Sequence, residues 1–133
     1  MPLDEAIYAK ADAHAGLEGL IGAPPRLYPM VAPQNGTAPY ATYQQISGPR
    51  VHAMGTDPGV ASPRYQFSAW GTSNSEAKLI AIQLIACFSR WRGIVAGTEV
   101  LDSFLENEVD LGLDDVALLH QRVLDFIIWH REP

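Results

Sequence analysis

The chain has 133 residues, 47% of them hydrophobic and 18% charged, which predicts a single globular domain over residues 1–133. Nine Lys and Arg against fifteen Asp and Glu give a net charge of −6, which disfavours a protein that binds nucleic acid by neutralising phosphates. One cysteine and four scattered histidines exclude a disulfide scaffold and a zinc module.

The sequence shows no sign of export or of membrane insertion. Its first five residues lack the basic and apolar regions of a signal peptide. No apolar run approaches the roughly 20 residues that span a bilayer. We therefore expect a protein that is made in the cytoplasm and has no membrane partner.

The N-terminal third predicts a helical region followed by strands. Residues 3–21 carry apolar side chains at helical spacing, and Asp12 and two glycines predict two helical pieces with a kink near Asp12. A double proline ends this region. Residues 27–28 and 40–47, the latter rich in Tyr, Thr and Ile, predict a short strand, a loop and a strand.

The middle of the chain predicts a loop, a strand and a long helix. Residues 48–63 hold three prolines and three glycines, which indicates a long exposed loop or a loose hairpin. Residues 64–71 alternate as a half-buried strand does. Residues 73–76 have the spacing of a capping box, from which an apolar stripe extends to residue 92, with Gly93 as the C-terminal cap.

Two further strands are predicted at residues 99–109 and 117–130. The last one is apolar on both faces, so we expect both faces to meet protein. The order of elements predicts an α+β fold, an antiparallel or mixed β-sheet with two main helices packed on one face.

We find no catalytic, cofactor-binding or metal-binding constellation in the sequence. It lacks a phosphate-binding loop and a nucleophile elbow. The acids at 106, 108 and 110 alternate as in a calcium loop, but the glycine and the bidentate Glu of such a loop are missing. Cys87 lies on the packed helical stripe and is interpreted as a core thiol. We predict a protein that is not an enzyme.

A second apolar ridge on the long helix predicts association with other proteins. Leu79, Ile82 and Ala86 lie opposite the core stripe. Exposed apolar patches commonly mark interfaces, although a loop of the chain itself is an alternative cover.

Charge is also segregated along the chain. Seven acids fall within residues 99–115 without any Lys or Arg, whereas Arg50, Arg64, Arg90 and Arg92 come earlier. Two surface patches of opposite charge suit a head-to-tail contact between copies of the protein. A solvated acidic strand pair is the alternative.

The order of short motifs resembles the tail-completion or tail-terminator family of long-tailed phages and phage-like particles, including gene transfer agents. The matching segments are 20–22 (LIG), 26–29 (RLYP), 32–34 (APQ), 39–44 (PYATYQ), 64–70 (RYQFSAW), 75–77 (SEA) and 125–130 (DFIIWH). The resemblance implies a hexameric ring that caps the finished tail tube and docks onto the head-completion, or stopper, protein. The ring's partners would be its own copies, the tail tube protein and the stopper, with DNA as non-specific cargo in the channel. It would be assembled in the host cytoplasm and would lie at the head-tail junction.

We assign three sets of residues to this function. The expected interface between copies comprises Leu79, Ile82, Ala86, Arg64 and Arg90. The expected partner-contact loop contains Arg50, Val51, His52 and Met54. The acids Glu106, Glu108 and Asp110 are expected to face the channel, because an acidic lumen does not hold DNA.

Two alternative functions stay open. One is a head-side joining or stopper protein. The other is a small α+β enzyme or ligand-binding domain that uses His14, His52 or His120 in a cleft.

Overall fold

The computed structural model describes residues 2–22, 24–30, 38–49, 55, 59–113 and 119–131. In chain order the elements are α1 (Pro2–Asp12), α2 (Ala15–Ile21), β1 (Leu27–Pro29), β2 (Tyr40–Ser47), β3 (Val60–Ala61), β4 (Arg64–Gly71), α3 (Asn74–Phe88), β5 (Gly93–Val95), β6 (Thr98–Leu113) and β7 (His120–Arg131). None of the helices in these ranges is long and apolar enough to cross a membrane.

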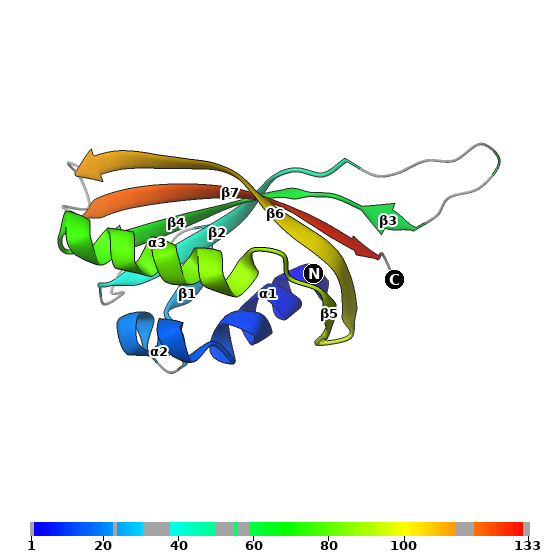
Figure 1. Ribbon diagram of the computed structural model, residues 1–133, viewed down its shortest axis with the longest axis horizontal. Helices are drawn as coiled ribbons and strands as arrows, with labels where there is room; N and C mark the ends of the chain where they lie inside the picture. Colours follow the sequence, from blue (N-terminus) through cyan, green and yellow to red (C-terminus); the bar gives the residue numbers. More distant parts are fainter. Residues whose placement is uncertain are drawn as a thin grey trace.

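The strands form one mixed, curled sheet in the order β1-β2-β4-β7-β6-β5, with β3 paired to β7 (Figure 1). Strand β1 is parallel to β2, and the other strand pairs are antiparallel. The predicted α+β class is therefore confirmed, and of the two predicted kinds of sheet the mixed one is present.

The predicted pair of helices is not confirmed, because the described chain has three. The two helical pieces predicted with a break near Asp12 are present as α1 and α2, and they are separated at His14, which is extended with φ −96° and ψ 106°. Helix α3 lies along β4 and β7, whereas α1 and α2 pack chiefly against each other and against α3 (Figure 1). The predicted packing of two main helices on one face of the sheet is therefore not confirmed: α3 packs on the sheet, and α1 and α2 lie beside α3.

Helix α3 begins where the capping box predicts. The backbone N–H of Glu76 donates to Ser73 Oγ at 3.1 Å. The Glu76 carboxylate accepts from the backbone N–H of Thr72 at 2.8 Å, one residue earlier than the reciprocal bond of a capping box. Both bonds satisfy backbone donors at the start of the helix.

The predicted end of this helix is wrong. Helix α3 ends at Phe88, and Gly93 is the first residue of β5, not a helix cap. The reason lies at Arg90, whose backbone has a positive φ of 55° and whose N–H donates to the Ser103 carbonyl at 2.8 Å. This bond turns the chain away from the helix and onto β6.

The two strands predicted at residues 40–47 and 64–71 are confirmed as β2 and β4. Strand β6 runs beyond the predicted residue 109 to Leu113, and β7 starts at His120, three residues later than predicted. Strand β3 lies inside the predicted loop at 48–63, where its partner is the end of β7. Residues 50–54 and 56–58 of that loop lie outside the described residues.

The core lies between α3 and the inner face of the sheet. The predicted alternation of β4 is confirmed, and the inner face of β7 is apolar as predicted. The buried inner residues of the two strands are Tyr65, Phe67, Ala69, Leu124, Phe126 and Ile128. Cys87 is buried in this core as predicted, and burial raises the pKa of its thiol to about 11.

Gly71 ends β4 directly against the first turn of α3. A Cβ atom at this position would lie 2.6 Å from the backbone nitrogen of Ala77, closer than real contacts allow. We expect Gly71→Ala to lower the free energy of unfolding by about 1–3 kcal/mol in urea denaturation. The control is Gly19→Ala in α2, where nothing lies within 4 Å. It should raise that free energy by about 0.5–1 kcal/mol, since Ala favours helix over Gly. Equal effects of the two variants would contradict a steric role for Gly71.

Candidate functional site

The outward face of α3 carries an exposed apolar ridge formed by Leu79, Ile82 and Ala86. The side chains of Leu79 and Ile82 are 52% and 47% exposed, whereas Leu84 on the opposite side of the helix is fully buried. The structure therefore confirms that the ridge is uncovered by the described part of the chain. Its role as an interface between copies stays a prediction.

A basic corner follows the end of α3 and consists of Arg90, Arg92, Asp102 and Phe104. Both guanidinium groups contact the same Asp102 oxygen, at 2.8 Å and 3.0 Å, and Arg90 also lies over the Phe104 ring at 4.5 Å. Desolvation alone would raise the pKa of Asp102, but the hydrogen bonds from Arg92 and from a backbone N–H, together with both Arg charges, lower it overall. Two cations on one carboxylate leave this corner with a surplus positive charge.

The predicted channel-facing acids Glu106, Glu108 and Asp110 are exposed on the distal half of β6. Arg122 of β7 donates to Glu108 at 2.8 Å and lies 3.6 Å from Asp110. Strand β5 pairs only with residues 98–100, so beyond them this edge of β6 has no strand partner in the described chain. Charged side chains along an open strand edge also prevent unwanted strand pairing.

Arg64 lies apart from the rest of the predicted interface. It alternates with the inward-facing Tyr65, so it points to the outer face of the sheet, away from α3. There it lies 3.8 Å from Asp125. The structure therefore brings Arg90 to the end of the α3 ridge but does not bring Arg64 to it.

The apolar residues on the outer face of β7 are largely shielded from solvent. Val123 is 6% exposed, and Ile127 and Trp129 are half-buried. The Trp70 indole N–H donates to the Thr42 hydroxyl at 3.1 Å across the neighbouring strands. The inner face of β7 meets protein as predicted, and the apolar residues on its outer face are buried or half-buried.

Sequence reasoning missed a groove between α1 and the β1-β2 edge of the sheet. It has a volume of about 380 Å³ and is lined by Asp4, Glu5, Tyr8, Leu27, Pro29 and Tyr43. Desolvation, together with the charge of Asp4, raises the pKa of Tyr43. The two acids in the first turn of α1 were the only sequence signal, and acids at a helix start are usual because they complement the helix dipole.

The two described histidines of the three proposed for a cleft, His14 and His120, do not form a common site. His14 shares a hydrogen bond with Gln83 at 3.1 Å between α2 and α3, as a structural histidine does, and His120 begins β7. His52 lies outside the described residues, together with Arg50, Val51 and Met54 of the predicted contact loop. Within the described ranges, no three His, Cys, Asp or Glu side chains are grouped to hold a metal ion.

Comparison with known proteins identifies the family. The family model described as "Tail completion protein gp17" matches residues 5–131, almost the whole chain. The chain belongs to this family. It is a structural protein of the phage-tail class, and the family suggested by its sequence motifs is confirmed.

The fold agrees with a solved structure of an assembled particle. A chain in the structure entitled "Virion of native gene transfer agent (GTA) particle" superposes with a TM-score of 0.63 at 18% identity, covering 95% of this chain and 90% of that one. This likeness shows a shared fold. No curated protein matches the sequence.

Proposed function

We propose that this tail completion protein forms a ring of identical subunits that ends the tail tube and joins it to a head-side protein, with DNA passing through its centre. Family membership supports a structural tail role, and the fold shared with a chain of a gene transfer agent virion supports a place within an assembled particle. The observation that carries the proposal is the exposed ridge of Leu79, Ile82 and Ala86. A structural protein with an uncovered apolar ridge has a surface to bury against another subunit.

The acidic edge of β6 supports a channel-facing position. Glu106, Glu108 and Asp110 lie close together along it, and Arg122 is the cation that contacts two of them. The described part of this edge therefore keeps a negative charge, which repels DNA and favours its passage. A ring whose lumen proved predominantly basic would contradict this placement.

The test is electron microscopy of the particles that contain this chain, with and without its gene. We expect density for the chain as a ring between tube and neck, and overlong or headless tails when the gene is removed. Density on the head side of that junction, with tails of normal length but no heads, would identify a head-side joining protein instead. Complete particles without the gene would refute a joining function altogether.

A further inference from the structure

The groove between α1 and the β1-β2 edge has the chemistry of a site for a cationic side chain. Tyr8, Leu27, Pro29 and Tyr43 provide apolar and aromatic walls, and the carboxylates of the first turn of α1 lie at the same hollow. A guanidinium group prefers such surroundings, because it stacks on aromatic rings and pairs with carboxylates. The groove therefore favours Arg over a neutral or acidic group.

Its carboxylates have no cationic partner within the described chain. One oxygen of Asp4 accepts the Tyr65 hydroxyl at 2.9 Å, which fixes the side chain without neutralising it. Glu5 is exposed and forms no ion pair with any described residue. The helix dipole explains acids at this position. It does not explain an aromatic hollow beside them.

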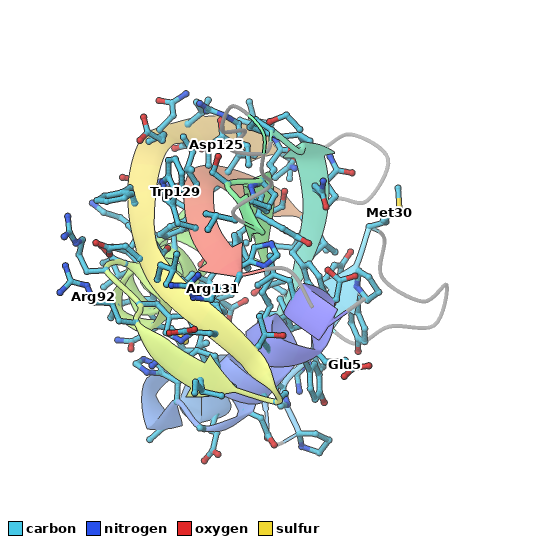
Figure 2. The ribbon with its side chains drawn as sticks, turned by 90° about the vertical axis from the view of Figure 1, so that its right-hand side faces the viewer. Glu5, Met30, Arg92, Asp125, Trp129 and Arg131 are labelled. Atoms are coloured by element: carbon cyan, nitrogen blue, oxygen red, sulfur yellow. The ribbon has the colours of Figure 1, made fainter. Side chains whose placement is uncertain are left out.

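The basic corner supplies the complementary group. The Arg90 and Arg92 side chains are 55% and 63% exposed, and both rely on the single carboxylate of Asp102. Figure 2 shows Arg92 and Glu5 on opposite sides of the molecule. Within one subunit the two side chains therefore lie apart, whereas a head-to-tail contact joins two different surfaces of the same protein and can close into a ring.

We propose that Arg92 of one subunit, with Arg90 beside it, enters the Asp4–Glu5 groove of the next copy. This inference rests on the proposed ring. The Arg92 guanidinium would pair with Glu5 and lie against the Tyr8 ring. The corner adjoins the C-terminal end of α3, so the apolar ridge is positioned to be buried at the edge of the same contact.

Cross-linking in assembled particles tests the contact directly. On a Cys87→Ala background, the variant with both Glu5→Cys and Arg92→Cys should give a ladder of disulfide-linked multimers on a non-reducing gel. Either single variant should give no ladder. A matched pair, Arg92→Cys with Glu18→Cys, uses an exposed acid of α2 outside the groove and should also give none. A ladder from the matched pair as strong as that from the Glu5 pair would overturn the proposal.

Charge reversal tests whether the pairing contributes to assembly. Arg92→Glu and Glu5→Arg should each weaken subunit association by about tenfold or more, because each places like charges in contact. Combined in one chain, the two reversals should restore most of the loss. Rings that assemble normally with either reversal and give no cross-link would refute this contact and leave the joining function intact. Particles in which the chain forms no ring at all would refute the proposed function itself.

Discussion

Replacing Phe67 by alanine is expected to lower the free energy of unfolding by about 3–5 kcal/mol. Phe67 is fully buried at the centre of an aromatic cluster. Its ring centroid lies 4.7 Å from that of Phe88 in α3, 5.6 Å from that of Phe126 in β7 and 6.1 Å from that of Tyr43 in β2. Truncation leaves a cavity bounded by several elements of the fold, which cannot all collapse into it.

Urea denaturation measures this loss, and Phe67→Leu is the control. Leucine keeps the site apolar and fills most of its volume, so it should cost at most about 1.5 kcal/mol. Since domains are stable by only about 5–15 kcal/mol, the alanine variant should also unfold at a visibly lower temperature. An alanine variant as stable as the leucine variant would contradict a central role for this ring.

The sequence predicted those elements whose boundaries depend on neighbouring residues in the chain. The alternation of residues 64–71 predicts β4 because one face of that strand packs on the core while the other does not. Ser73 predicts the start of α3 because its hydroxyl caps the helix without help from the rest of the fold. The break near Asp12 is likewise visible in the residues themselves.

Elements that depend on distant partners were missed or misplaced. Helix α3 ends before the predicted residue because Arg90 bonds to Ser103 on β6, a partner that no local pattern reveals. Strand β3 has two residues and exists through its pairing with the end of β7. Short strands of this kind have too few residues to show a period.

The surface features also differ in how far the sequence could predict them. Leu79 and Ile82 were predictable as an exposed ridge because helical spacing separates them from the core stripe. The groove was not, because α1, β1 and β2 bring its lining together from separate parts of the chain. Arg64 was grouped with the ridge by charge alone, and its strand directs it to the other face of the sheet.

The second large effect is expected at the ridge, from the double variant Leu79→Asp with Ile82→Asp. Both side chains are about half exposed, so the isolated subunit should keep its fold, with its free energy of unfolding lowered by about 1 kcal/mol per site through lost helix propensity and apolar burial. Assembly should suffer far more, because an interface would have to bury two carboxylates without partners. We expect the yield of joined particles to fall by about a hundredfold, counted by electron microscopy, since two such charges cost several kcal/mol.

Lys78→Asp provides the matched control, because it changes the net charge by the same amount on the same helix. Lys78 is exposed next to Leu79 and is not one of the three apolar residues that form the ridge. If burial of the ridge drives assembly, this control should keep most of the yield that the double variant loses. Equal losses from both would assign the effect to charge instead of apolar contact. Normal yields from the double variant would show that the ridge faces solvent in the particle, and the interface between copies would then have to lie elsewhere on the subunit.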